Sequence, residues 1–312
     1  MPRIVTLTLN PTVDISTRTS RVEHTSKLRC ELPRRDPGGG GINVARVVNA
    51  LGADAVGVFP AGGPCGAMLC QSLDEMGVPH RAVPITGETR ESFTVAEAET
   101  GLQYRFVMPG PSLSEAELRG CLHAIETLDP APDCLVVSGS YPPDVPLSFH
   151  DQLLALSRRL DIPMVLDSSG EALRHAVRTG GLFLIKPSLH ELAYLRGESV
   201  RTAEEQDAAV AELVVAGVAD IVVLSLGENG AVAATRDGVR RFPAIPVSEG
   251  SAVGAGDTMV AATTLALLQG WEVWDAVRYG MAAGAATVMS PGTALCAAED
   301  VERLYRISAL GA

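Results

Sequence analysis

The chain has 312 residues, of which 46% are hydrophobic and 20% are charged, so it can bury a sizeable core and is not expected to be disordered. Its 25 basic and 37 acidic residues give a net charge of −12, which argues against non-specific binding to nucleic acid or to an anionic membrane surface. No apolar run approaches the ~20 residues that span a bilayer, and the N-terminal segment lacks the layout of a signal peptide. We therefore expect a cytoplasmic protein that binds neither nucleic acid nor membranes.

The cysteines and lysines give further information about the kind of protein. The 6 cysteines form no CxxC pair and no zinc-type cluster, so we expect free thiols. Only two lysines, Lys27 and Lys186, accompany the many arginines. A lysine kept in such a chain indicates a position that needs a compact ammonium group, although chance is the alternative.

The first third of the chain combines strands with a polar stretch. Alternating β-branched residues predict a strand over 3–9, and a helical period over 42–52 follows a run of glycines. Further along we expect a strand, a helix and then a half-apolar hairpin, over 55–60, 68–76, 92–99 and 103–108.

From residue 113 onward helices and strands alternate. Continuous β-branched runs predict buried strands at 134–140, 163–169, 182–187 and 221–227, and a second hairpin at 231–235 and 239–245. Helices are expected at 113–128, 148–160, 171–180, 190–196, 203–217, 257–269, 273–288 and 299–307. This order predicts an α/β fold with a doubly wound, mainly parallel sheet flanked by helices. The segments at about 15–35 and 90–108 do not fit inside such a sheet, and we expect them to form a small β-sheet lid on one domain spanning 1–312.

Residues 36–46, DPGGGGINVAR, place four glycines before a helix. Glycine lets backbone amides approach a ligand closely, and a helix N-terminus favours negative or electron-rich groups. The run is neither a P-loop nor the GxGxxG of dinucleotide-binding proteins. It predicts contacts to a hydroxylated ligand through the glycines and the Asn43 amide, with a purely structural glycine loop as the alternative.

Residues 251–262, SAVGAGDTMVAA, place Gly254, Ala255 and Gly256 before an apolar helix that has Asp257 at its start. Asp257 could be a helix N-cap and nothing more. The small residues before it also predict successive free amides that hold a transferring phosphoryl group. In that interpretation Asp257 is a general base at the mouth of an anion hole.

Other polar positions fit a phosphorylated substrate and a nucleotide. Asp14 follows the first strand, where a carboxylate faces the usual ligand crevice unless it only shapes a turn. Lys186 ends a strand, and Glu191 begins the next helix. A lysine at the first position would suit the phosphates of a nucleotide, and a carboxylate at the second would suit the shell of a magnesium ion. An adenosine would lie against backbone further along, at Ser225, Gly227 and Gly230.

Basic residues gather on or near the proposed lid. Lys27, Arg29, Arg90 and Arg105 would suit a phosphate on the substrate, or they form a solvated edge that keeps a strand from aggregating. The histidines, His150 among them, show no ligand spacing and are expected to be surface or capping residues.

The motifs GGGGINVAR, VSGSYPP, LIKPSLHEL and VGAGDTM, in this order, resemble the pfkB/ribokinase family of carbohydrate kinases over nearly the whole chain. Within the family, LTLNPTVD, KLRC, YRFVMPG and DSSGEAL look most like the branch of bacterial minor 6-phosphofructokinases, which also contains 1-phosphofructokinases and tagatose-6-phosphate kinases. The resemblance implies a ribokinase-like fold and ATP-dependent phosphorylation of fructose 6-phosphate at its C1 hydroxyl, a step of glycolysis. It also implies Mg²⁺, candidate activation by K⁺, and a homodimer formed through the lid.

The resemblance also implies a role for each matching residue. Asp257 falls on the catalytic base, and the anion hole for the γ-phosphoryl group falls on Gly254, Ala255 and Gly256. Contacts to the sugar or its phosphate fall on Asp14, Lys27, Gly39, Gly40, Asn43, Arg90 and Ser140. The nucleotide site falls on Lys186, Ser188, Ser225, Gly227 and Gly230.

The chain departs from the family pattern near its ions. The family's Asn-x-x-Glu motif near magnesium appears with Ser188 in place of Asn, while Glu191, which would meet Mg²⁺ through water, is kept. A K⁺ ion would be held by backbone carbonyls around Ser251, Val253, Ser290 and Gly292. Two other classes stay open, a non-catalytic sugar-phosphate sensor and a nicotinamide oxidoreductase, although GxGxxG is missing after the first strand.

Overall fold

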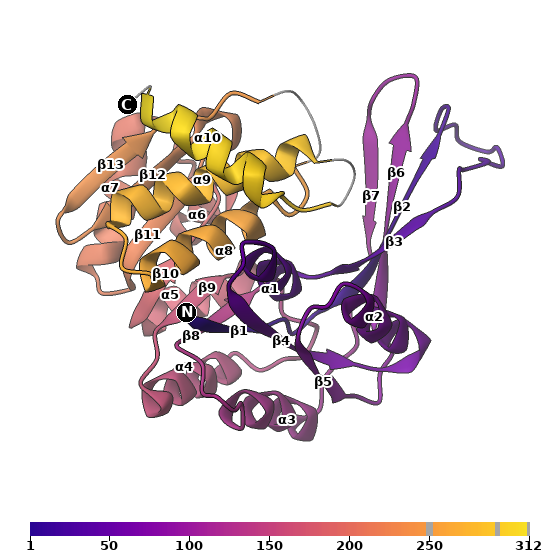
Figure 1. Ribbon diagram of the computed structural model, residues 1–312, viewed down its shortest axis with the longest axis horizontal. Coiled ribbons are helices and arrows are strands. Elements are labelled where there is room, and N and C mark those ends of the chain that lie inside the picture. Colours follow the sequence, from indigo (N-terminus) through magenta and orange to yellow (C-terminus); the bar gives the residue numbers. More distant parts are fainter. Residues whose placement is uncertain (248–251, 291–293, 311–312) are drawn as a thin grey trace.

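The computed structural model describes residues 1–247, 252–290 and 294–310, and its centre is a nine-stranded sheet (Figure 1). Its strands lie in the order β13-β12-β11-β10-β9-β8-β1-β4-β5. In chain order they are β1 (Arg3–Leu7), β4 (Asp54–Ala61), β5 (His80–Pro84), β8 (Cys134–Ser138), β9 (Met164–Asp167), β10 (Leu182–Ile185), β11 (Ala219–Ser225), β12 (Ala231–Thr235) and β13 (Gly238–Phe242).

Seven neighbouring strands from β11 to β5 pair in parallel, and the two pairings of β12, with β11 and with β13, are antiparallel. The prediction of a doubly wound, mainly parallel sheet is therefore confirmed. Strand β1 lies between β8 and β4, so the chain winds outward in both directions from this point. Ligands bind at such a reversal, in the crevice beyond the carboxyl ends of the strands.

Helices cover both faces of the sheet. One face carries α1 (Gly40–Ala50), α2 (Gly63–Glu75), α8 (Ala255–Leu268), α9 (Val273–Met289) and α10 (Ala298–Leu310). The other carries α3 (Glu115–Glu126), α4 (Ser148–Leu160), α5 (Gly170–Thr179), α6 (Leu189–Arg196) and α7 (Ala203–Val215). Successive residues of a strand point to opposite faces, so Ile4 packs in the first core and Val5 in the second.

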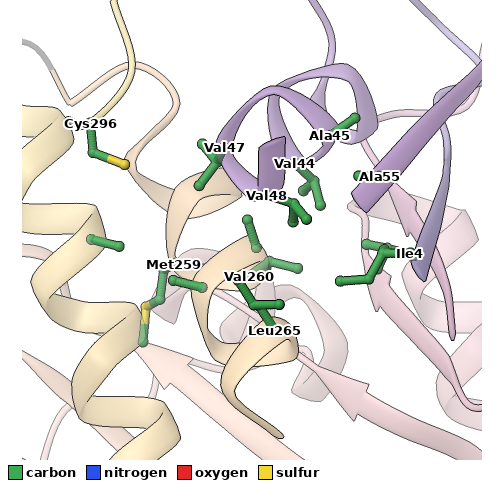
Figure 2. Packing of buried hydrophobic residues seen from close by; sticks show 14 of the residues in the cluster. Ile4, Val44, Ala45, Val47, Val48, Ala55, Met259, Val260, Leu265 and Cys296 are labelled. Atoms are coloured by element: carbon green, nitrogen blue, oxygen red, sulfur yellow. The ribbon is translucent and has the colours of Figure 1, made fainter. Parts of the chain in front are cut away.

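Helices α1 and α8 pack directly against each other. Val44, Val47 and Val48 of α1, which are wholly buried, face Val260 of α8 (Figure 2). Because interiors are close-packed, this contact fixes the position of one helix relative to the other. The N-terminal ends of both helices carry residues singled out from the sequence.

A second, smaller sheet projects from the main body (Figure 1). It contains β2 (Thr12–Thr19), β3 (Arg34–Gly38), β6 (Arg90–Glu97) and β7 (Gln103–Val107), in the order β3-β2-β6-β7. These strands overlap the segments expected to form a lid. A lid function itself stays a prediction.

Two local expectations were wrong. Strand β5 was not predicted, because in HRAVP only Val83 is buried and the alternation is weak. His150 lies in the first turn of α4, but it is neither exposed nor a cap, because the helix turns its side chain into the core, where it is fully buried. No helix among the described residues combines the length and apolarity that crossing a membrane requires.

Candidate active site

A cavity of about 180 Å³ lies between the small sheet and the N-terminal ends of α1 and α8. It brings together residues from β2, β6 and β7 on one side and from α1 and α8 on the other. Its lining includes eight residues predicted to contact substrate or phosphoryl group, Asp14, Gly39, Gly40, Asn43, Arg90, Arg105, Gly254 and Asp257. Segments more than 200 residues apart in the chain thus meet in one hollow, as Asn43 and Asp257 show.

Asp257 lies in the first turn of α8, and its carboxylate accepts two hydrogen bonds. Asn43 Nδ2 donates to Oδ2 at 2.9 Å, and Ser138 Oγ donates to Oδ1 at 3.3 Å. Burial raises the pKa of Asp257, although Asn43, Lys186 and Ser138 favour its charged form. The N-cap of α8 is Gly254, whose φ of 78° is left-handed, and not Asp257. The carboxylate is therefore free of a capping role and faces the cavity.

The glycine run meets the end of β8. Helix α1 begins at Gly40, one residue after its N-cap Gly39, so the glycines reach into the first turn and do not all precede the helix as expected. A Cβ built on Gly40 would lie 2.2 Å from Ser138 Oγ and 2.8 Å from the Gly139 nitrogen. Only glycine lets α1 approach β8 this closely, so this residue has a packing reason beside any contact with a ligand.

Asp14 and two arginines form the wall contributed by the small sheet. Burial raises the pKa of Asp14 to about 6, although Arg90 and Arg105 favour its ionised form. The Arg90 guanidinium donates to the carbonyl oxygens of Asn10 and Met108, at 3.1 Å each, which holds it at the cavity wall. This wall combines an acceptor for hydroxyl groups with cations for an anion.

Three predicted substrate contacts do not line the cavity. Lys27 and Arg29 are exposed and lie in the connection between β2 and β3, which extends to the far end of the small sheet (Figure 1). Their proposed contacts need a different position of the sheet or a second chain. Ser140 is also exposed, and its Oγ accepts a hydrogen bond from Asn10 Nδ2 at 3.1 Å.

Lys186 lies behind Asp257 at the end of β10. Its Nζ is 3.3 Å from Asp167 Oδ1, and only 7% of its side chain is exposed. Burial opposes its charge, but Asp167, Glu191 and Asp257 outweigh that effect and raise its pKa. A Cβ on Gly256 would lie 3.3 Å from Nζ, so the small residue lets the ammonium approach the start of α8. The second lysine of the chain thus lies beside the proposed anion hole.

The other nucleotide candidates form a structural unit beside Lys186. Ser188 caps α6 and Glu191 completes a capping box, since Glu191 Oε2 accepts from the Ser188 nitrogen at 2.8 Å and from its Oγ at 2.9 Å. Ser225 pairs with Ser188 through an isolated bridge, and Gly227 opens a short 3₁₀ turn. At Gly230, φ is 92° and a Cβ would lie 2.0 Å from the Phe242 oxygen, so close strand approach requires glycine there.

Only some of the predicted metal-binding residues lie among the described residues. Across 1–247, 252–290 and 294–310, no group of three or more His, Cys, Asp or Glu side chains is arranged to hold an ion. Val253 lines the cavity, and Ser290 Oγ donates to the carbonyl oxygens of Ala286 and Leu295. Ser251 and Gly292 lie outside the described residues.

Sequence reasoning missed two polar residues at the heart of the site. Ser138 contacts Asp257, whereas Ser140 was the residue of VSGSYPP that was singled out. Asp167 pairs with Lys186 and is 14% exposed. Both are polar residues at the carboxyl ends of apolar strands, LVVS and MVLD, and this position was the signal that could have found them.

A buried carboxylate among amide and hydroxyl donors, a helix start rich in small residues and a buried lysine define a phosphotransferase site on a doubly wound α/β scaffold. The model of the pfkB family of carbohydrate kinases matches residues 7–300. The chain belongs to this family.

Relatives and solved structures agree with that membership. The chain is 48% identical over 308 residues to the ATP-dependent 6-phosphofructokinase isozyme 2 of Mycobacterium tuberculosis, covering 99% of this chain and 90% of that one. Identity to the Escherichia coli protein of the same name is 40% over 305 residues, with 98% of each chain covered. A 1-phosphofructokinase of Haloferax volcanii is 32% identical over 299 residues, covering 96% of this chain and 95% of that one.

Among solved structures, Escherichia coli phosphofructokinase-2 in complex with fructose-6-phosphate has a TM-score of 0.93 at 39% identity, covering 99% of this chain and 100% of that one. The same Escherichia coli protein in complex with potassium has a TM-score of 0.94 at 40% identity, covering 99% of this chain and 100% of that one.

Proposed function

We propose that the protein is an ATP-dependent 6-phosphofructokinase that converts fructose 6-phosphate to fructose 1,6-bisphosphate. The observation that carries this proposal is the cavity in which Asp257 faces Asp14, Arg90 and Arg105. One end offers a base and the other offers cations for a phosphate, as a phosphorylated acceptor with a free primary hydroxyl requires. The two relatives at 48% and 40% identity support the choice of this sugar phosphate.

In this proposal the sugar spans the cavity. Arg90 and Arg105 hold the 6-phosphate, and Lys27 and Arg29 join them from the lid. Ring hydroxyls are held by the backbone and side chains of the two walls and their rim, namely Asp14, Gly39, Gly40, Asn43 and Ser140. Charged hydrogen bonds from arginine to phosphate supply most of the affinity for the anion.

The C1 oxygen attacks the γ-phosphorus as the bond from that phosphorus to the bridging oxygen breaks, and ADP leaves. The proton of the C1 hydroxyl goes to Asp257. The amides of Gly254, Ala255 and Gly256 and the ammonium of Lys186 stabilise negative charge on the transferring group. A carboxylate whose pKa is raised by burial accepts this proton more readily than an exposed one.

The nucleotide is proposed to lie along Lys186, Ser188, Ser225, Gly227 and Gly230. Magnesium is compatible with these residues, because Mg²⁺ keeps several waters and binds chiefly through substrate phosphates, so no protein cage is needed. Glu191 Oε2 accepts the hydrogen bond from the Ser188 nitrogen. We propose that the same carboxylate contacts Mg²⁺ through a water molecule. When bound, the ion neutralises charge on the phosphates.

Potassium activation belongs to the same proposal, with carbonyls near Ser251, Val253, Ser290 and Gly292 as the ligands. Backbone carbonyls do not depend on side-chain identity, so such a loop is compatible with the side chains of this sequence. The potassium complex of the Escherichia coli protein supports the idea. Equal turnover in potassium and tetramethylammonium chloride would exclude it.

We further propose that the chain is one kinase domain over 1–312 that works in the cytoplasm as a homodimer through the small sheet, which closes over the sugar as a lid and excludes water. Large apolar side chains are exposed on and next to this sheet, at Leu102, Phe106, Val107 and Met108. Such side chains indicate a surface that another chain covers. Sedimentation that finds only monomers would contradict the dimer.

A 1-phosphofructokinase or a tagatose-6-phosphate kinase is the second candidate, and the Haloferax volcanii relative favours the first of these. A sensor that binds a phosphosugar without turnover is the third. The decisive experiment measures ADP release with Mg-ATP and fructose 6-phosphate, fructose 1-phosphate, tagatose 6-phosphate or fructose. Comparing kcat/KM ranks transition-state binding. A clear preference for fructose 6-phosphate is expected, and a preference for another acceptor would overturn the substrate while keeping the kinase.

A further inference from the structure

A chain of hydrogen bonds leads from strand β3 to the proposed base. Arg46 Nη1 donates to the Pro37 carbonyl oxygen at 3.0 Å and to Asn43 Oδ1 at 3.1 Å. Asn43 Nδ2 in turn donates to Asp257 Oδ2 at 2.9 Å. Arg46 itself does not line the cavity, so any effect it has on the reaction passes through Asn43.

The chemistry of the three groups fixes the direction of the Asn43 amide. A guanidinium only donates hydrogen bonds, so it can face only the amide oxygen. An ionised carboxylate only accepts them, so it can face only the amide nitrogen. With Arg46 in place, both ends of the amide are therefore assigned, and a flip would set donor against donor and acceptor against acceptor.

The packing around α1 leaves the amide as the part that can move. Val44, Val47 and Val48 hold α1 against α8 (Figure 2), and none of these contacts involves Arg46. Loss of the guanidinium would thus leave the two helices in place. The Asn43 amide would lose the partner that selects its orientation.

We propose that Arg46 is a positioning residue, which orients the Asn43 amide so that it donates to Asp257. This inference rests on the proposed function, in which Asp257 takes the proton of the acceptor hydroxyl. A flipped amide would present its oxygen to the carboxylate and would destabilise the ionised form that acts as base.

The charges around Arg46 and around Asp257 keep both groups in the ionisation states that these hydrogen bonds need near neutral pH. Burial lowers the pKa of Arg46, the carboxylates of Asp36 and Asp14 oppose this effect, and Arg34 adds to it. Arginine nevertheless stays protonated in proteins. At the other end, Asp257 faces the ammonium of Lys186 from β10, and Asp167 on β9 lies near enough to be affected by its charge.

The test is a double-mutant cycle between Arg46 and Asn43 with fructose 6-phosphate as the acceptor. Arg46→Met should lower kcat about tenfold, which corresponds to one lost hydrogen bond to a charged group, and leave KM for ATP within about twofold. In an Asn43→Ala background, the same change should alter kcat by less than about twofold, because Arg46 acts only through that amide. Arg46→Lys, which keeps a charged donor, should recover part of the turnover.

The matched control is Arg81→Met. Arg81 is also half-buried, and its Nη1 donates to the carbonyl oxygens of Ala124 and Thr127, away from the cavity. This variant should keep wild-type kcat even if its melting temperature falls. If Arg46→Met melts below the assay temperature, Arg46→Lys in both backgrounds takes its place in the cycle.

The outcomes separate this inference from the function on which it rests. If the wild type phosphorylates no acceptor, or Asp257→Asn keeps full turnover, the proposed function fails and the positioning role fails with it. If both behave as proposed but Arg46→Met keeps wild-type kcat, only the positioning role is wrong. It is equally wrong if Arg46→Met lowers kcat as much in the Asn43→Ala background as in the wild type.

Discussion

Replacing Asp257 by Asn is the most direct perturbation of the proposed chemistry. The new side chain keeps the size of the old one, its oxygen can still accept from Asn43, and its nitrogen can donate to Ser138. An amide cannot take a proton from a hydroxyl, so the general base is lost while the packing is kept. General bases contribute about 10²–10⁴-fold, so kcat should fall at least ~10²-fold, or by about 3 kcal/mol.

The same change should not weaken nucleotide binding. Asp257 is one of the carboxylates that favour the charged form of Lys186, so its removal leaves that ammonium with less negative charge nearby. We therefore expect KM for ATP to stay within about threefold or to fall.

The assay is steady-state ADP release over a range of each substrate, with thermal melting as a check of folding. Ser138→Ala is the matched control, since it removes the longer of the two hydrogen bonds and keeps the carboxylate. It should lower kcat by less than about tenfold. An Asp257→Asn protein that melts normally and keeps more than about a tenth of wild-type kcat would refute the role of Asp257 as base.

Three further predictions concern the sugar wall, the glycine contact and the buried histidine. Arg90→Ala should raise KM for fructose 6-phosphate at least ~10-fold with kcat nearly kept, and an unchanged KM would remove Arg90 from the site. Gly40→Ala should lower the melting temperature and turnover, because its Cβ would meet backbone at 2.8 Å, whereas Gly57→Ala, with no atom nearer than 3.8 Å, should do much less. Burial lowers the pKa of His150 to about 4. Between about pH 6.5 and 4 the unfolded chain therefore binds a proton at this residue that the folded chain does not bind. The free energy of unfolding should fall across this range by up to roughly 3 kcal/mol. His150→Leu should flatten this acid dependence of the melting temperature and exposed His24→Gln should not; equal slopes for His150→Leu and the wild type would contradict it.

The main sheet could be predicted because its signal is local. Runs such as CLVVS and ADIVVLS are apolar on both faces, and each strand was expected within a few residues of its place. Strand β5 was the exception, because it lies at the sheet edge and buries only one side chain well. Edge strands carry little of the pattern that sequence reasoning uses.

The candidate site was only partly predictable for a different reason. Asp14, Asn43 and Asp257 stand out as polar residues beside glycines or strand ends, and the fold brings all three to one cavity. Ser138 ends the apolar run LVVS and Ser140 lies two residues further on, so the strand-end position favoured Ser138, and the structure shows that Ser138 is the one that contacts Asp257. Lys27 shows the opposite outcome. It stands out in the sequence as one of two lysines, but it lies in the connection between β2 and β3, away from the cavity.

The surroundings of Asp257 show why several distant segments must meet there. A carboxylate that acts as a base near neutral pH needs enough burial to favour taking a proton and enough stabilisation to be ionised beforehand. Its burial raises the pKa, while Asn43 of α1, Ser138 of β8 and Lys186 of β10 each oppose that effect. No single motif supplies both influences, because a helix start alone offers no more than a cap. The proposed base therefore depends on the junction between α1, α8 and the sheet, and a change at any of its three partners should alter turnover more than folding.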